Sequence, residues 1–396
     1  MKRGAALENL TAAIIEICRS GLPPEALRDR VLARLCRTVP FDASFWASVD
    51  PTTLLFTQPH QNEIPGDTVP YFIENEFLDE DVNKWTDLAS ERSGVRTLLQ
   101  ATAGDMEASP RYRDIFQPLG LGDELRAVLR VGGACWGYIC LHREAGAPFS
   151  KQEIDYVQRL TPHLAEGIRA GLLVSATELA NVADAPGLVV VAPDGSLLSS
   201  TEAGELWLEE LGHPDPRRPR VPMEVQALAA RARGQGLTDG LPRLRVRTRA
   251  GRWAVLHASR LTMSETEATA VIIEEPSPAE LAPVLMMAYG LTKQERTLTG
   301  LVCRGLSTNE IADRLHITPH TIQDHLKSIF DKTGVSSRRE LVATILQEQY
   351  LPRAIAGQPI GPSGFFTSRS SSEPTDRPPV DSRSPIWSPT PPAKPS

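Results

Sequence analysis

Six polar side chains near one short segment have the chemistry to bind nucleic acid: His320, Thr321, Gln323, Asp324, Lys327 and Lys332. A glutamine can bond adenine bidentately, a lysine can donate to guanine O6 and N7 or to a phosphate, and an aspartate can accept from cytosine N4. A threonine at a helix start, together with the backbone amides there, suits phosphate oxygens. Gathered on one helix face, these groups would contact double-stranded DNA.

The same segment predicts the helix that such side chains need. Thr318 is a favourable N-cap, and Pro319 fits the first helical position, where its missing N–H costs nothing. An apolar stripe, spanning about 100° at 3.6 residues per turn, must face a core. It consists of Ile322, Leu326, Ile329 and Phe330. The polar side chains therefore lie on the opposite, exposed face.

Three further helices are predicted around this one. They span Thr292 to Arg304, Asn309 to Leu315 and Ser337 to Gln349. Gly305 can end the first helix in the left-handed conformation, and Ser307 or Thr308 caps the second. Two short helices joined by about three residues, the second starting Thr-Pro, are typical of a helix-turn-helix.

Residues 285–350 resemble the LuxR-type DNA-binding domain, an all-α domain of four helices. The resemblance rests on Leu291-Thr292 with Glu295, Gly305 to Ser307, Glu310 to Ala312, Leu315, Ile317, Thr321 to His325, and Lys332 with Gly334-Val335. It implies that the third helix enters the major groove, with Gln323, Asp324 and Lys327 near base edges. The chain departs from the family at Gln323, where lysine is frequent. The last helix corresponds to the family's dimer-forming helix, which implies a homodimer on DNA through Leu341, Val342, Ile345 and Leu346.

Residues 1–175 predict an α+β domain, because two amphipathic helices precede alternating strands and a long final helix capped by Ser150 and Glu153. The run from Glu124 to Arg169 resembles the end of a GAF-type sensory domain. Between Tyr71 and Asp87, four aromatic residues alternate with six acids. A pocket for an aromatic or cationic small-molecule ligand is one interpretation. The favoured interpretation is that the aromatics face the core and the acids face water.

Residues 180–276 predict a second α+β domain. Its order of strand, Asp-Gly turn, strand, helix and three more strands resembles a PAS domain. Five arginines alternate near its third strand: Arg243, Arg245, Arg247, Arg249 and Arg252. A solvated face is the favoured interpretation of this stripe, and the alternative is a site for an anionic ligand or for docking onto another acidic domain.

Composition limits the remaining choices. Five cysteines lack the spacing of a zinc site or a disulfide framework, so no metal and no cofactor are expected. The longest apolar runs fall short of the ~18 residues of a membrane span, which predicts a cytoplasmic protein with no membrane partner. Residues 1–290 carry 39 acidic against 29 basic side chains, whereas residues 291–350 carry 7 against 8. Only the C-terminal part can therefore accommodate a polyanion.

Three hypotheses follow for the whole chain. The first is a transcriptional regulator in which a signal sensed upstream controls a DNA-binding dimer. The second, an enzyme fused to a DNA tether, is disfavoured because residues 1–290 contain no P-loop, no Gly-x-Ser-x-Gly, no His-Glu-x-x-His and no dinucleotide fingerprint. The third, a scaffold that binds protein rather than a small ligand, is not separated from the first.

Residues 352–396 predict a disordered tail, because 11 Pro and 9 Ser occur there without any apolar period. We predict that deleting everything after Tyr350 leaves DNA binding unchanged. Electrophoretic mobility shift assays on the truncated and full-length proteins measure this. A truncated protein that folds but does not bind would contradict the disorder prediction.

Overall fold

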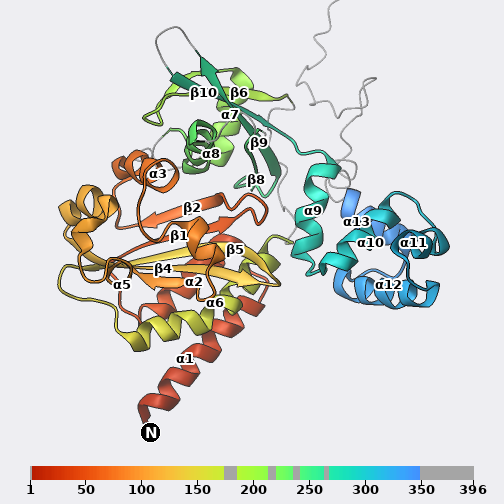
Figure 1. Ribbon diagram of the computed structural model, residues 1–396, viewed down its shortest axis with the longest axis horizontal. Coiled ribbons are helices and arrows are strands. Elements are labelled where there is room, and N and C mark those ends of the chain that lie inside the picture. The colour runs from red at the N-terminus through yellow and green to blue at the C-terminus, as the bar shows by residue number, and fades with distance from the viewer. Residues whose placement is uncertain (1, 174–184, 213–219, 235–240, 263–266, 348–396) are drawn as a thin grey trace, which may run out of the picture.

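The computed structural model describes residues 2–173, 185–212, 220–234, 241–262 and 267–347, and the predicted tail lies outside them. Two five-stranded antiparallel sheets are followed by a group of helices (Figure 1). This agrees with the expected sequence of mixed α/β domains and an all-helical C-terminal domain. We refer to residues 2–173 as the first domain, 185–274 as the second domain and 290–347 as the C-terminal domain.

The first domain has the strand order β2-β1-β5-β4-β3. Its strands are β1 (Ala43–Val49), β2 (Phe56–Asn62), β3 (Val95–Thr97), β4 (Leu121–Val131) and β5 (Ala134–Glu144). Its main helices are α1 (Lys2–Arg19), α2 (Pro24–Leu35), α3 (Val69–Phe77), α4 (Trp85–Ser90), α5 (Leu98–Ala101) and α6 (Lys151–Gly171). Short helical turns occupy Gly66–Thr68, Met106–Ala108, Tyr112–Phe116 and Gln117–Leu119.

Local sequence signals explain two of these elements. Gly132 and Gly133 both have positive φ, at 62° and 76°, which lets a two-residue turn join β4 to β5. Ser150 and Glu153 form the predicted capping box at the start of α6. The two predicted N-terminal helices and the predicted long final helix are confirmed.

Each face of the first sheet is covered by different helices. α1, α2 and α6 pack on one face, around a core that includes Trp136, Val157 and Leu164. The other face carries α3 and α4. Figure 1 shows α1 extending away from the body at the N-terminus.

The second domain repeats the strand order of the first, as β7-β6-β10-β9-β8. Its elements are β6 (Gly187–Val191), β7 (Leu197–Ser200), α7 (Glu202–Leu211), α8 (Met223–Gly234), β8 (Arg243–Arg247), β9 (Trp253–Thr262) and β10 (Glu267–Glu274). Gly195, with φ of 81°, lies in the predicted turn between β6 and β7. The predicted strands are confirmed, and α8 is an addition to the sequence prediction.

Helix α8 lies between the two domains. It packs against β9 and β10 of its own sheet and against α3 and β2 of the first domain (Figure 1). Nine of its twelve residues are buried. A helix buried on all sides must belong to a shared interior. The two domains therefore have one continuous apolar core on this side of the first sheet.

The favoured interpretation of the arginine stripe, a solvated face, is wrong for its central members. Arg245 forms a bidentate ion pair with Asp50 of the first domain, at 3.0 and 3.2 Å. Arg247 is 9% exposed and donates to the carbonyl oxygens of Gly171 and Leu172 at the end of α6. Docking onto the first domain, the alternative interpretation, describes these contacts.

Helix α9 (Pro278–Ala288) connects the two sheet domains to the C-terminal domain. Ala288 belongs to the core of the first domain and Ala282 to that of the C-terminal domain. Arg245 also donates to the carbonyl oxygen of Glu280 in α9, at 2.9 Å. One guanidinium thus contacts the first domain, the second domain and the connecting helix.

We predict that Arg245→Gln destabilises the packing of the two sheet domains by about 3 kcal/mol, because it leaves the buried Asp50 carboxylate without its cation. Thermal unfolding and the rate of limited proteolysis measure the change. Arg243→Gln is the matched control, since Arg243 lies two residues away on the same strand and is exposed. Equal effects of the two substitutions would contradict the prediction.

Candidate nucleic-acid interface and the buried charge cluster

The C-terminal domain consists of four helices, as predicted. They are α10 (Lys293–Cys303), α11 (Thr308–Leu315), α12 (Pro319–Thr333) and α13 (Arg338–Gln347). The side chains of Ser307 and Thr318 accept backbone N–H bonds and cap α11 and α12. Between these helices, His316 adopts the left-handed conformation with φ of 55°. These features produce the short turn that a helix-turn-helix requires.

Helix α12 divides its side chains between core and solvent as its sequence predicts. Ile322, Leu326 and Ile329 are buried, and Phe330 is partly buried. The predicted contact residues His320, Gln323, Asp324 and Lys327 are exposed, and Thr321 is half-buried beside the cap Thr318. The structure therefore brings five of the six predicted residues to one end and one face of α12.

The exposed face carries donors and acceptors that are weakly engaged within the protein. His320 Nδ1 lies 3.2 Å from Asp324 Oδ2, with both side chains largely exposed. Gln323 Nε2 lies 3.5 Å from Thr308 Oγ1, which is long for a hydrogen bond. Among the described residues, Lys327 has no hydrogen-bond or ion-pair partner. These groups can exchange their contacts for base edges or phosphates at little cost.

Lys332, the sixth predicted residue, has a different environment. Its Nζ lies 2.6 and 2.8 Å from the two carboxylate oxygens of Glu295 in α10. Ser328 Oγ donates to the same carboxylate at 2.8 Å. Arg338, another cation close to the helix-turn-helix, donates to Leu306 O and Thr308 Oγ1. Lys332 thus joins α12 to α10, and Arg338 joins α13 to the start of α11. Lys327 remains the cation of α12 without a partner among the described residues.

The Glu295 carboxylate is the polar link between α10 and α12. Burial favours its neutral form, but the bonds from Lys332, the Thr292 amide and Ser328 outweigh burial and lower its pKa to about 2. Glu295 also completes the capping box of α10 with Thr292. A single side chain therefore starts α10 and fixes the orientation of α12.

The four residues expected to form a dimer lie in two environments. Leu341 and Ile345 are 0% and 2% exposed and belong to the core of the C-terminal domain. Val342 and Leu346 are only partly buried against that core. Helix α13, which carries all four, packs against α9 and α10. In this arrangement Val342 and Leu346 retain surface for a second copy, whereas Leu341 and Ile345 position the helix from inside.

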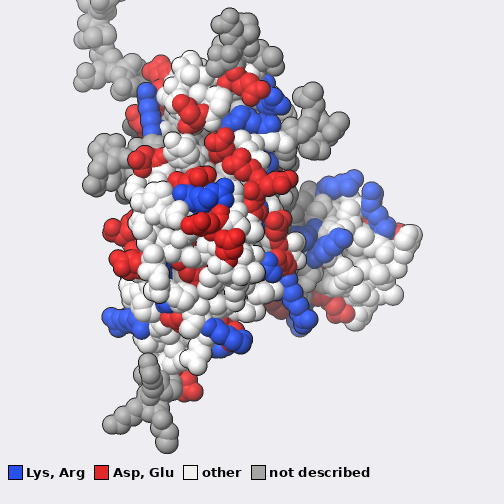
Figure 2. All heavy atoms as spheres, turned by 60° about the vertical axis from the view of Figure 1, so that its left-hand side comes forward, with Lys and Arg blue, Asp and Glu red and all other residues white. Residues whose placement is uncertain are grey.

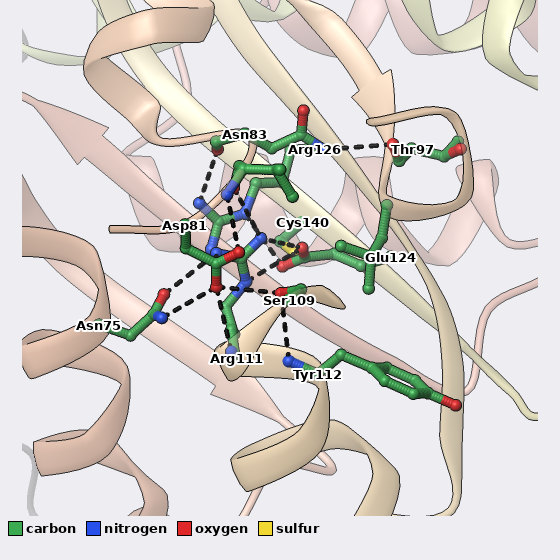
Figure 3. Close-up of polar contacts among 12 residues, drawn as sticks. Asn75, Asp81, Asn83, Thr97, Ser109, Arg111, Tyr112, Glu124, Arg126 and Cys140 are labelled. Atoms are coloured by element: carbon green, nitrogen blue, oxygen red, sulfur yellow. Dashed lines mark hydrogen bonds and ion pairs between the residues drawn. The ribbon is translucent and has the colours of Figure 1, made fainter. Parts of the chain in front are cut away.

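A cluster of buried charges occupies the interior of the first domain (Figure 3). Arg111 Nη2 and Arg126 Nε lie 2.9 and 3.0 Å from the two carboxylate oxygens of Glu124. Arg126 also pairs with Glu76 at 2.8 Å, and Arg111 with Asp81 at 3.3 Å. All these side chains are at most 3% exposed. Most of the polar atoms of the cluster pair with one another, whereas Arg126 Nη2 is buried without a partner among the described residues.

The favoured interpretation of the segment from Tyr71 to Asp87 holds in part. Phe72 and Trp85 are buried and Phe77 is partly buried, while the exposed acids are Glu74, Asp79, Glu80 and Asp87. The interpretation is wrong for Glu76 and Asp81, which face the buried guanidiniums, and for Tyr71, which is 63% exposed. Arg126 lies over the Trp85 ring at 4.5 Å, and Tyr138 stacks on that ring at 4.3 Å. A cavity of about 200 Å³ remains beside the Trp85 ring and is lined also by Phe77 and Glu76. The sequence offered no signal for the ion pairs, because Arg111 and Arg126 are distant from the acidic segment.

Glu124, Cys140 and His142 place three potential metal-ligand atoms within 4.8 Å of one another. Their chemistry does not suit a cation. Burial raises the pKa of the Cys140 thiol well above its usual value, and the thiol donates to Glu124 at 3.0 Å. Burial lowers the pKa of His142 to about 4. Burial alone would raise the pKa of Glu124, but the charges of Arg111 and Arg126 outweigh burial and hold the Glu124 pKa well below its usual value. A carboxylate already neutralised by two guanidiniums and bonded to a protonated thiol cannot hold a metal.

Comparison with known proteins places the C-terminal domain in a family. The family model described as bacterial regulatory proteins of the luxR family matches residues 290–345. A putative HTH-type transcriptional regulator of Mycobacterium bovis, Mb0914c, is 46% identical over 52 residues, which are 13% of this chain and 6% of that protein. The DNA-binding transcriptional activator DevR/DosR of Mycobacterium tuberculosis is 39% identical over 51 residues, 13% of this chain and 24% of that protein. The chain thus matches less than a quarter of either relative's length.

Solved structures also match the chain, at low scores. Escherichia coli SdiA has a TM-score of 0.31 at 12% identity, covering 84% of this chain and 94% of that one. The GAF domain of a sensor histidine kinase from Bacillus halodurans has a TM-score of 0.25 at 15% identity, covering 35% and 92%. Neither score supports a conclusion about ligand or mechanism. None of the described helices has the length and apolar character needed to cross a membrane.

We predict that acid destabilises the C-terminal domain through Glu295. Its pKa is lower in the folded chain, at about 2, than the ordinary 4.5, so the folded state gains stability above pH 4.5 and loses it progressively as the pH falls toward 2. Glu295→Gln should lower the stability at pH 7 by about 1–3 kcal/mol and flatten this pH dependence. Hydrogen exchange of the α12 amides, corrected for intrinsic rates, measures both effects.

Glu310→Gln is the matched control, because Glu310 completes the same kind of capping box at α11 but is exposed and does not contact α12. If the Glu295 and Glu310 variants showed the same protection of α12, the proposed link between α10 and α12 would be refuted.

Proposed function

Because residues 290–345 belong to the luxR family of bacterial regulatory proteins, we propose that the protein is a transcriptional regulator that binds specific DNA sites through α12. The observation that carries the proposal is the exposed face of α12, with Gln323, Asp324 and Lys327 available to base edges. The relatives support it, since each relative described above is named as a transcriptional regulator or activator.

The distribution of charge supports the same role. Asp and Glu spread across much of the visible face of the two sheet domains, whereas Lys and Arg prevail on the visible part of the C-terminal domain (Figure 2). A polyanion is repelled by the first surface and attracted by the second. The protein thus directs DNA to its C-terminal domain, although the net charge of the chain is −7.

The protein acts as a homodimer on DNA in this proposal. A single α12 presents few base contacts, and a dimer doubles both these contacts and the phosphate-binding cations. Val342 and Leu346 of α13 provide the partly exposed apolar surface for the partner copy. Leu341 and Ile345 support that surface from the core.

The two sheet domains serve as the sensory part of the regulator. The first is GAF-like and the second PAS-like in this assignment, which is supported by the order of their elements and by the strand order that both sheets share. Arg245 and α9 provide the physical route by which a change in their packing would reach the C-terminal domain. Control requires a ligand or partner that distinguishes two packing states.

The experiment is selection of genomic fragments with the purified full-length protein, followed by a salt titration on the best fragment. The expected fragment contains two half-sites related by two-fold symmetry, and its affinity should fall steeply with salt. A single half-site bound by one copy would contradict the dimer. If the full-length protein bound DNA without sequence preference, residues 278–350 would be tested alone. Absence of sequence preference in both proteins would contradict specific recognition.

We predict that Lys327→Ala weakens binding to the selected site by about 1–3 kcal/mol without changing the fold, because it removes the free cation from the recognition face. Fluorescence anisotropy with labelled duplex measures the affinity. Lys293→Ala is the control, since Lys293 is an exposed lysine at the first position of α10. Parental affinity in the Lys327 variant would place the recognition face elsewhere.

A further inference from the structure

A cavity of about 160 Å³ lies between the first and second domains. Its walls come from α2, β1, β2 and α3 on one side and from α7, α8 and β8 on the other. A cavity of about 150 Å³ can hold a molecule of the size of benzene. By contrast, the cavity beside Cys140 and His142, within the first domain, measures about 10 Å³. Among these two, only the cavity between the domains has room for a small organic ligand.

Glu224 and Arg247 are buried charged side chains that line this cavity. Glu224 is the second residue of α8 and is 4% exposed. Its carboxylate accepts a hydrogen bond from its own backbone N–H, and it forms no ion pair with another described residue. Burial raises the pKa of this carboxyl to about 7. A buried acid is normally paired, because burial without a partner is costly. Among the described residues, Glu224 therefore lacks a cation partner.

Gln58 supplies a second acceptor in the same cavity. A bulge in β2 places Gln58 and Pro59 opposite the single residue Ala47, because Trp46 pairs with His60 and Ser48 with Thr57. The side chain of Gln58 reaches across the domain boundary, and its Nε2 donates to the Arg247 carbonyl oxygen at 3.3 Å. Its Oε1 is buried and has no partner among the described residues. Among the described residues, the Gln58 side-chain oxygen thus lacks a donor and the Glu224 carboxylate lacks a cation.

Two further guanidiniums, those of Arg28 and the exposed Arg249, line the cavity, as does the exposed Glu25. Arg28 donates through Nε to Asp29, and Arg249 donates through Nη2 to the Glu209 carbonyl oxygen, which leaves other N–H groups of each guanidinium for a ligand. Trp46 and Met223 contribute apolar wall.

We propose that this cavity binds a small zwitterion, with its ammonium group on Glu224 and Gln58 and its carboxylate facing Arg28 and Arg249. Free amino acids and short ω-amino acids belong to this class. The ligand contacts both domains, so it stabilises their packed arrangement relative to any separated one. Ligand binding itself needs no DNA. The proposal rests on the proposed function only for the effect that ligand binding would have on DNA binding.

The test measures thermal unfolding of the full chain, without DNA, in the presence of L-alanine or γ-aminobutyrate. Ethylammonium chloride and sodium propionate serve as probes that carry only one of the two charges. We expect at least one zwitterion to raise Tm by about 2 °C or more, and neither single-charge probe to do so. Equilibrium dialysis with the labelled zwitterion then gives Kd.

Glu224→Gln should raise Kd at least tenfold, because the ammonium loses its counter-ion. The variant should fold, since it removes an ionisable group from a buried position. Glu202→Gln is the matched control and should bind as the parent does, because Glu202 is exposed in the first turn of the neighbouring helix α7. Met223→Trp fills the cavity and should abolish binding independently of charge.

Three results would overturn the proposal: no rise in Tm with either zwitterion, an equal rise with ethylammonium or propionate, or an unchanged Kd in a folded Glu224→Gln variant. None of them would affect the assignment of α12 to DNA, which is measured separately. Failure of DNA binding, in turn, would leave the zwitterion measurements valid.

Discussion

The burial of α8 between two sheets is the constraint on which the arrangement of the protein depends. Its centre, from Val225 to Ala230, is buried, and its small alanine side chains let β9 and β2 approach it from opposite sides. Because the helix has no solvent-facing stripe there, neither domain could keep it alone without exposing apolar surface. The two sheet domains therefore pack as a pair, and this packing defines the position of the helices that follow them.

The C-terminal domain is one of the parts so positioned. Arg245 contacts Asp50, its own strand and the backbone of α9, while α9 contributes to two separate cores. A shift between the sheet domains must therefore break a buried ion pair or move α9. Packed interfaces of this kind switch between discrete arrangements rather than deforming gradually. The geometry thus favours an all-or-none response over a graded one.

The sequence predicted the parts of the fold that depend on local signals. Capping residues such as Ser150, Ser307 and Thr318 start helices where expected, and the apolar stripe of α12 fixed its exposed face. It did not predict α8, because an alanine-rich helix buried on all sides has no amphipathic period. It also missed that Lys332 would be tied to Glu295, 37 residues away. Which cation pairs and which remains free depends on tertiary contacts that spacing alone does not encode.

The buried charges of the first domain make its interior a poor site for a ligand. Arg111 and Arg126 form an ion-pair cluster with Glu76, Asp81 and Glu124, and a ligand entering there would have to displace paired charges with no solvent to stabilise them. At the domain boundary the situation differs, because Glu224 is buried without a cation among the described residues and gains from a cation that reaches it. A ligand binds where the protein has left a polar group unpaired, and a change at the boundary acts directly on α8 and β8. The boundary between the two sheet domains is therefore a better position for a sensor than the interior of either domain.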